Sequence, residues 1–360
     1  MATYYVDTAN GSDSNGGLSE GDAFATIQHA VDTAAANSTI YVEGTGNYNE
    51  EVIVDDKDMT IIGYSSTPGD NGRVVIDGQS TRTTCITMKN TSVSNADFVF
   101  RNFELKNATG DGLLLQRNTG GANSKNWIDN VSAHDNGGHG IHINWNGGNT
   151  LQPVTRCFAY DNTGDGFHCG TNSPLPIFAF CKAIGNGGLG IDGASKGAAA
   201  YCLSHSNTDD NFGPLGVLIN CTSDDSGSDG WVNYSNNGFS TAINCGFTNN
   251  GAYGIRNAGT NQLLLFSVGV NSNTTANYLD TPRLNIGEVT SSPSYNDQPN
   301  DDFTLSQSSA WKQQSLVVGL EDGSELTYSD IGAFQINVTG GGGGLGISQG
   351  MHGIESGIIA

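Results

Sequence analysis

The stretches NVSAHDNGGHGI (residues 130–141), RCFAYDNTGDGF (156–167) and FCKAIGNGGLGI (180–191) can be superimposed letter by letter without a gap. Each carries small, amide and apolar residues at the same spacing. One structural unit is therefore repeated, and repeats of about 20 to 50 residues are typical of solenoid proteins.

The alignment extends to eight copies that begin 19 to 28 residues apart. One inward position holds Phe103, Val131, Cys157, Cys181, Cys202, Cys221, Cys245 and Val268. Five residues further on stand Ala108, Asn136, Asn162, Asn186, Asn207, Ser226, Asn250 and Asn273. Nine residues beyond the inward position stand Gly112, Gly140, Gly166, Gly190, Asn211, Gly230, Gly254 and Asn277. An apolar residue follows this last position in every copy.

Each of these aligned positions has a physical interpretation. Five of the seven cysteines occupy the inward position, where a free thiol packs as a small apolar side chain, so neither disulfides nor a metal site is predicted from them. The recurring Asn predicts a ladder in which each side-chain amide bonds the next. The recurring Gly or Asn predicts a left-handed backbone conformation.

Short strands separated by such turns predict parallel pairing between successive coils, about 4.8 Å apart. Ahead of the strands, Phe24, Ile27, Val31 and Ala34 recur with helical spacing. This pattern predicts a short amphipathic helix that covers the open N-terminal end of the stack.

The sequence resembles the pectate-lyase-like parallel β-helix proteins in three places: YYVDTANGSDSNGG (4–17), ATIQHAV (25–31) and DIGAF (330–334). The resemblance covers roughly residues 4 to 335 and implies an all-β, single-stranded, right-handed parallel β-helix with a short N-terminal capping helix. It implies no single activity, because the group includes lyases, glycosidases, epimerases, and viral or phage tailspikes and fibres.

Four regions are predicted along the chain. Residues 1–38 form a strand, a loop and the capping helix, residues 39–280 the β-helix, and residues 281–339 a closing segment. Residues 340–360 are a five-glycine linker and an apolar tail that we expect to dock onto another copy or another protein. Its apolar residues are Leu345, Ile347, Met351, Ile354, Ile358 and Ile359.

The net charge is −22, from 36 acidic and 14 basic residues. Such a field disfavours binding to nucleic acid and to anionic membranes. No run of 18 apolar residues predicts membrane insertion, and MATYYV (1–6) lacks the basic start of a secretion signal. We therefore expect a protein made without a leader and located in a virion, with an extracellular, secreted protein as the alternative.

Candidate chemistry lies one residue past the inward apolar position, on the outer surface of consecutive coils. His142, His168 and Asp192 share this position and could shuttle a proton or bind a cation, although solvated surface residues give the same pattern. No cofactor is predicted. Calcium is left open by acidic turns such as Asp111-Gly112 and Asp165-Gly166, but these acids do not fall in adjacent coils.

Two further features of the sequence concern carbohydrate: an isolated tryptophan and a pair of short motifs. Trp145, in a variable turn, is the predicted glycan contact. The segments GHG (138–140) and NTDD (207–210) are similar to fragments of polygalacturonase motifs but stand in the reverse order, so that match is rejected.

A uronate lyase of this fold usually uses Lys or Arg as its base, and other basic residues close by are needed to shift the pKa of that base. No two of Arg156, Lys182 and Arg256 share an aligned position, so no basic groove is predicted.

The sequence favours a structural virion component, such as a capsid decoration, fibre or tailspike-like protein that binds surface glycans. Its predicted partners are other virion proteins or copies of itself, in a homo-oligomer that family analogy makes a trimer. The alternatives are a secreted lyase or glycosidase acting on an acidic polysaccharide, and a non-catalytic carbohydrate-binding surface protein. Enzymatic activity is left open, with its absence favoured.

Overall fold

The computed structural model describes residues 1–91, 96–117, 125–145, 151–170, 175–234, 239–260, 262–279, 284–298, 302–306, 308–311, 317–319 and 325–327. The apolar tail at residues 345–359 lies outside this set. The docking role of the tail stays a prediction.

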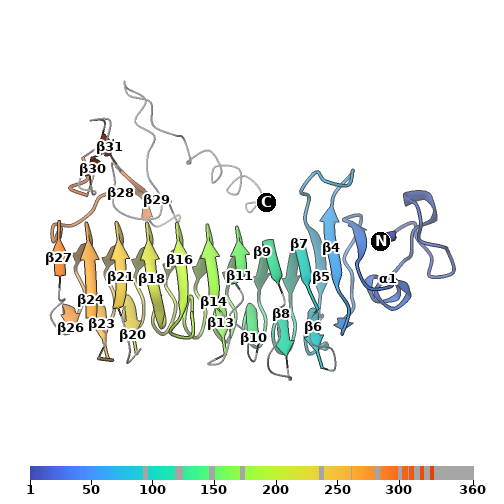
Figure 1. The fold of residues 1–360 in the computed structure, drawn as a ribbon, viewed down its shortest axis with the longest axis horizontal. Coiled ribbons are helices and arrows are strands. Elements are labelled where there is room, and N and C mark those ends of the chain that lie inside the picture. Colours follow the sequence, from blue (N-terminus) through green and yellow to red (C-terminus); the bar gives the residue numbers. More distant parts are fainter. Residues whose placement is uncertain are drawn as a thin grey trace.

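Parallel strands stack along one long axis, with the N-terminal helix at one end (Figure 1). The largest sheet has 19 strands, and β1 pairs with β2 in parallel. Its strands are β1 (Thr3–Asp7), β2 (Ser38–Glu43), β4 (Met59–Tyr64), β5 (Val74–Asp77), β7 (Phe98–Lys106), β9 (Asn126–His134), β11 (Leu151–Thr155), β12 (Phe158–Tyr160), β14 (Leu175–Ala179), β15 (Lys182–Ile184), β16 (Gly197–Ala200), β17 (Leu203–His205), β18 (Leu215–Ile219), β19 (Thr222–Asp224), β21 (Phe239–Ile243), β22 (Gly246–Thr248), β24 (Gln262–Phe266), β25 (Gly269–Asn271) and β27 (Leu284–Ile286).

Two smaller parallel sheets close each coil. One contains β3 (Val52–Asp55), β6 (Ile86–Asn90), β8 (Leu113–Arg117), β10 (Ile141–Trp145) and β13 (Phe167–Cys169). The other contains β20 (Trp231–Asn233), β23 (Tyr253–Asn257) and β26 (Ala276–Leu279). Parallel bridges through Ile191 and Phe212 join the two. The chain therefore folds as a right-handed parallel β-helix, which confirms the predicted fold class.

The N-terminal cap consists of η1 (Glu20–Asp22) and α1 (Ile27–Thr33). The side chain of Thr26 accepts a hydrogen bond from the backbone N–H of His29 and so satisfies one unpaired donor of the first helical turn. Ile27, Ala30 and Val31 are buried against the first coils. The amphipathic pattern therefore predicted the helix correctly.

The aligned positions form continuous files inside the coils. All five inward cysteines are buried and none is in a disulfide. The Asn ladder is also confirmed, since Nδ2 of Asn136 donates to Oδ1 of Asn162 (2.9 Å), Asn162 to Asn186 (3.0 Å) and Asn186 to Asn207 (2.9 Å). These buried amides hold neighbouring turns in register.

The prediction for the glycine file was wrong. None of its glycines has a positive φ. A Cβ on Gly140 would instead lie 2.7 Å from the carbonyl oxygen of Gly166 and 2.8 Å from Nδ2 of Asn162. Glycine is needed there because the Asn ladder and the next coil approach too closely for any side chain.

Left-handed backbone occurs at two other corners of each coil. One corner immediately precedes the inward position and includes Asn102, Asn130 and Asn244, while the other immediately precedes the Asn ladder and includes Asp135 and Asp161. Asn and Asp tolerate this conformation better than most residues.

Beyond the last coils, β28 (Tyr295–Asp297) and β29 (Asp302–Leu305) form an antiparallel pair, as do β30 (Val317–Gly319) and β31 (Glu325–Thr327). The ring of Trp311 lies against Gly246 and Gly269, and Phe303 packs on Leu203. This segment covers the outer face of β17 to β25. Among the described residues, no helix is long and apolar enough to cross a membrane.

Candidate functional site

Six titratable side chains gather on one edge of the β-helix, where turns lead into β8, β10 and β13. We call them the His–Asp cluster: Asp111, His139, His142, Asp165, His168 and Asp192. Part of it was predicted. His142 pairs in register with His168, and the bridge from Phe167 to Ile191 places Asp192 one coil further. The structure therefore brings together the three residues expected from the sequence.

The other three members, Asp111, His139 and Asp165, each immediately precede a glycine of the aligned glycine file. The backbone N–H of His139 donates to Oδ1 of Asp111 (2.8 Å), and that of Asp165 donates to Nδ1 of His139 (2.9 Å). The backbone N–H of Leu189 donates to Oδ1 of Asp165 (2.8 Å). Each side chain thus satisfies a backbone donor of the next coil, which fixes its rotamer.

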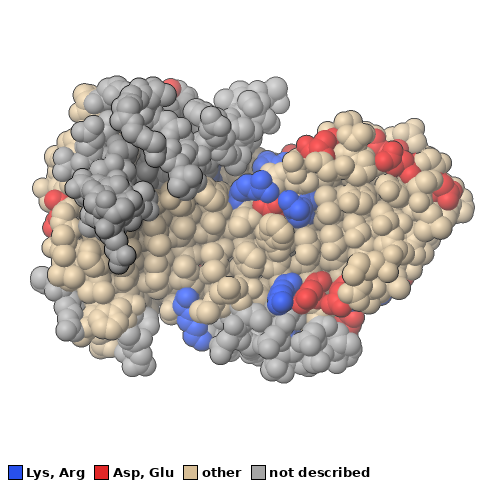
Figure 2. Space-filling view, turned by 45° about the horizontal axis from the view of Figure 1, so that its top comes forward, with Lys and Arg blue, Asp and Glu red and all other residues tan. Residues whose placement is uncertain are grey.

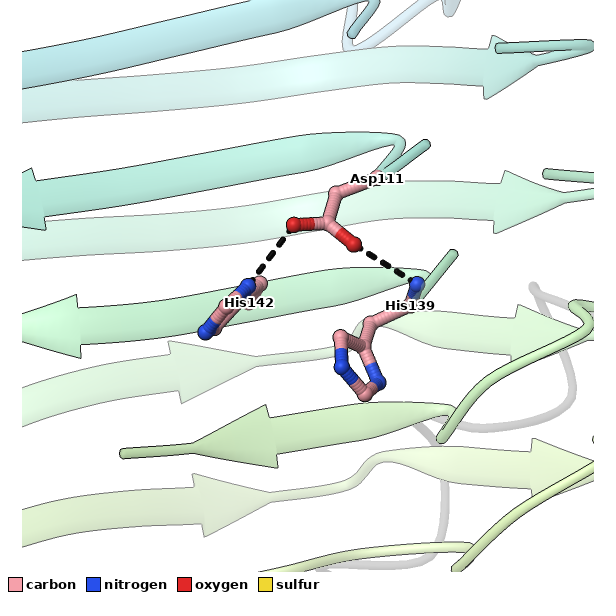
Figure 3. Close-up of side chains that lie close together, drawn as sticks. All are labelled: Asp111, His139 and His142. Atoms are coloured by element: carbon pink, nitrogen blue, oxygen red, sulfur yellow. Dashed lines mark hydrogen bonds and ion pairs between the residues drawn. The ribbon is translucent and has the colours of Figure 1, made fainter. Parts of the chain in front are cut away.

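The second oxygen of two of these carboxylates orients an imidazole. Oδ2 of Asp111 lies 2.7 Å from Nδ1 of His142 (Figure 3). Oδ2 of Asp165 lies 2.6 Å from Nδ1 of His168. An ionised carboxylate only accepts hydrogen bonds, so both Nδ1 atoms carry the proton. In the neutral rings, the Nε2 lone pair on the far side is then left as a base.

His139 has the opposite tautomer, because its Nδ1 accepts the N–H of Asp165. Its neutral ring therefore carries the proton on Nε2. The ring stacks on that of His168, with centroids 4.2 Å apart and planes 11° from parallel, and meets His142 edge-on at 5.0 Å. The side chains of all three histidines remain 18% to 28% exposed, so solvent and ligands reach them.

The charges of the cluster separate the pKa values of its members. Burial by itself would lower the pKa of His168, but the hydrogen bond to Asp165 and the charges of nearby carboxylates outweigh burial and raise it. Burial and the neighbouring His168 lower the pKa of His139. The two stacked rings are therefore pushed toward opposite protonation states.

Two carboxyl groups differ in the same way. Burial opposes ionisation of Asp111, yet the hydrogen bonds from His142 and from the His139 backbone win and lower its pKa. Burial raises the pKa of Asp192, whose Oδ2 lies 3.5 Å from Nδ1 of His168. Divergent environments of this kind are typical of acid–base sites.

A metal ion was also considered, because Asp111, His139 and His142 place one ligand atom each within 4.8 Å of one another, as do His139, Asp165 and His168. Imidazole-rich sets suit zinc-like ions, whereas calcium prefers oxygen ligands. Both carboxylate oxygens of Asp111 and of Asp165 already accept hydrogen bonds. The donor set does not fit calcium.

The remaining sequence predictions have mixed outcomes. The side chain of Trp145 lies outside the described residues. Asp229, which precedes Gly230 as Asp165 precedes Gly166, faces Arg256, with Oδ2 3.1 Å from Nη1. His139 was not predicted, although the alignment contains its signal: Asp111, His139 and Asp165 each immediately precede the recurring glycine.

No basic groove was predicted from the aligned positions, but the structure brings two arginines from unaligned positions together. Arg101 and Arg156 both bond the buried carboxylate of Asp129, from neighbouring coils. Figure 2 shows Lys and Arg side chains near the middle of the molecule, with acidic side chains directly beside them and others toward the ends. Different turn geometries bring unaligned positions together, which a comparison of aligned positions does not detect.

Comparison with solved structures shows that this fold is also that of a pectate lyase. Pectate lyase Pel9A superimposes with a TM-score of 0.64 and 18% identity, over 94% of this chain and 97% of its own. The A-module of the mannuronan C-5 epimerase AlgE4 of Azotobacter vinelandii gives 0.46 and 14%, over 80% and 97% of the two chains. ORF18 of Geobacillus virus E2 gives 0.45 and 15%, over 74% and 57%.

At this identity the superposition on pectate lyase Pel9A establishes a shared fold. No family model matches the sequence, and no curated protein sequence does.

Proposed function

We propose that the protein is an acid–base enzyme that cleaves a uronate-containing polysaccharide by β-elimination at the His–Asp cluster. The observation that carries the proposal is the pair of carboxylate-oriented imidazoles, His142 and His168, on adjacent coils. The substrate class is suggested by the pectate lyase that shares the fold. An extended polymer also suits a site spread along the side of a solenoid.

In this mechanism the Nε2 lone pair of His142 takes the proton from the carbon next to the sugar carboxyl group. The electron pair of that C–H bond forms a C=C bond, and the C–O bond to the leaving sugar breaks. His168, whose raised pKa keeps it protonated to higher pH, gives its Nε2 proton to the leaving oxygen. The proton lost and the proton supplied balance, and the product is an unsaturated sugar.

The large negative charge of the chain opposes a polyanionic substrate at long range. Within the site, protonated His168 and the Nε2–H of His139 attract the negatively charged carboxylate of the substrate. Asp192, whose pKa burial raises, retains its proton to higher pH than an ordinary Asp and so adds less negative charge. These groups lower the local cost of bringing a carboxylate next to the base.

The test is the absorbance of unsaturated products from polygalacturonate or alginate. His142→Gln and His168→Gln should each reduce turnover about 10²- to 10⁴-fold. His134→Gln is the matched control, because His134 also bonds carboxylates, Asp135 at 2.7 Å and Glu104 at 3.3 Å, but lies on another face of the coil. Release of reducing ends without unsaturation would assign hydrolysis instead, and no turnover of either polymer would reject the proposal.

The second candidate is a virion component that assembles with copies of itself or with other virion proteins. It is supported by the end of the largest sheet, where Leu284 and Ile286 on β27 are 40% and 47% exposed. Apolar groups on a terminal strand favour association. Light scattering of the full chain and of a chain truncated at residue 339 tests it, and an unchanged mass on truncation would contradict a docking role for the tail.

A further inference from the structure

The corner that precedes the inward position carries large side chains in three consecutive coils, where the preceding two coils carry Asn. All eight corner residues have a left-handed backbone, with φ between 50° and 67°. They are Asn102, Asn130, Arg156, Phe180, Tyr201, Asn220, Asn244 and Ser267. Large side chains are rare in this conformation, and three in succession call for a physical reason.

The outer parts of the file show what a corner residue ordinarily does. Nδ2 of Asn130 donates to Oδ1 of Asn102 (2.9 Å), and Nδ2 of Asn244 donates to Oδ1 of Asn220 (2.6 Å). This second Asn ladder stops at Arg156, Phe180 and Tyr201. At these three positions, Asn, which tolerates the left-handed conformation and could continue the ladder, is replaced by a larger residue.

Core packing does not explain the replacement, because the three side chains point outward. Arg156 is exposed, and Phe180 and Tyr201 are half-buried. The two aromatic rings stack on each other, with centroids 5.1 Å apart and planes 12° from parallel. Strain that is retained for an outward-facing side chain is characteristic of a binding surface.

A rigid aromatic surface lies beside this corner. Trp127 is 39% exposed, and its ring is held by the guanidinium of Arg101 at 4.8 Å and by a hydrogen bond from Nε1 to Oγ1 of Thr155 (3.0 Å). Thr155 immediately precedes Arg156 in the chain. The indole and the Arg156 side chain therefore border the same patch of surface.

The patch is also basic in a strongly acidic chain. Arg101 and Arg156 share the single carboxylate of Asp129, whose side chain is fully buried. Two positive charges against one negative charge leave an excess, and the Arg156 side chain is 45% exposed. Arg73 adds a third guanidinium nearby, bonded to the corner residue Asn130 (2.9 Å).

From this geometry we propose a second binding site, separate from the His–Asp cluster, for an acidic oligosaccharide. The apolar face of a sugar ring packs on Trp127, and the sugar carboxylate binds the guanidinium of Arg156, the pairing for which the planar fork of Arg is suited. From Arg156 to Tyr201 the surface spans two coil spacings, roughly 10 Å. That length accommodates a disaccharide along the solenoid axis, with the second sugar over Phe180 and Tyr201.

The test uses titration calorimetry with a galacturonate hexamer and, as the neutral control, a glucose hexamer of equal length. Arg156→Asn and Trp127→Ala should each weaken galacturonate binding about tenfold or more, the equivalent of one lost charge-assisted bond or stacking contact. Arg156→Asn introduces the residue that the corner favours but removes one of the two guanidinium partners of the buried Asp129 carboxylate, so the Tm should fall and the binding constant is the readout. His134→Gln, whose ring lies outside both sites, should bind the galacturonate hexamer with the parent affinity.

Two results would overturn the proposal. The first is parent protein that binds the glucose hexamer as tightly as the galacturonate hexamer, or binds neither. The second is an affinity that Arg156→Asn and Trp127→Ala leave unchanged.

Discussion

Replacing Asp165 by Asn tests the electrostatic design of the His–Asp cluster without requiring a substrate. The amide oxygen can still accept the N–H of Leu189, so the structural bond of Asp165 is retained. The side chain loses its charge and the acceptor that lies 2.6 Å from Nδ1 of His168. The perturbation therefore acts first on the His168 imidazole, and more weakly on His139, whose Nδ1 lies 3.5 Å from Oδ2 of Asp165.

The magnitude follows from the bond that is lost. A hydrogen bond to a charged group is worth about 1.5–3 kcal/mol. Because 1.36 kcal/mol corresponds to one pH unit, the pKa of His168 should fall by about 1 to 2 pH units. Asp192 remains 3.5 Å away and still favours the charged ring, which places the expected change near the lower end.

The assay is an NMR titration of the His168 ring protons, assigned by comparison with His168→Gln. Asp192→Asn is the matched control, because its carboxylate is more distant and should change the pKa of His168 less. A change below about 0.3 pH units in Asp165→Asn, or a rise, would refute the assignment of Asp165 as the main stabiliser of the charged ring.

The same substitution should also change the free energy of unfolding, by an amount that depends on pH. The raised pKa of His168 means that its contribution to folding is fully present below the unfolded pKa and is lost as the pH rises through the folded pKa. Asp165→Asn should therefore lower the free energy of unfolding more at about pH 5 than at about pH 9. Equal losses at both pH values would indicate a purely structural effect.

Three further predictions concern the fold that carries the site. Burial raises the pKa of Asp210 to about 6, so Asp210→Asn should raise the free energy of unfolding by about 1–3 kcal/mol near pH 8, and urea unfolding near pH 4 should show no gain. Asn162→Leu removes the acceptor of the buried Asn136 amide and should cost about 3–5 kcal/mol in the same assay, whereas a cost under about 1 kcal/mol would contradict the ladder's role. Gly140→Ala should lower the Tm by several degrees, and Gly21→Ala, whose Cβ has open space, should leave it unchanged.

Much of the fold could be predicted because each structural role recurs at the same aligned position in many coils. Cys181 and Cys202 are interpretable as core because five coils agree, and Asn162 as a ladder member because its neighbours agree. The glycine file shows the limit of this approach. Recurrence shows that Gly140 must be glycine, but a positive φ and a lack of room for Cβ give the same sequence pattern.

The sequence by itself determined the period of the coils, the inward and outward alternation of the strands, and the alignment of His142, His168 and Asp192. These depend on local backbone geometry and on register, which one copy of the repeat transmits to the next. Only the tertiary structure decided that Asp111 and Asp165 orient the imidazoles, and that Arg101 and Arg156 meet on Asp129. Such contacts join different positions of different coils, and their distances depend on turn conformations that a linear alignment does not contain.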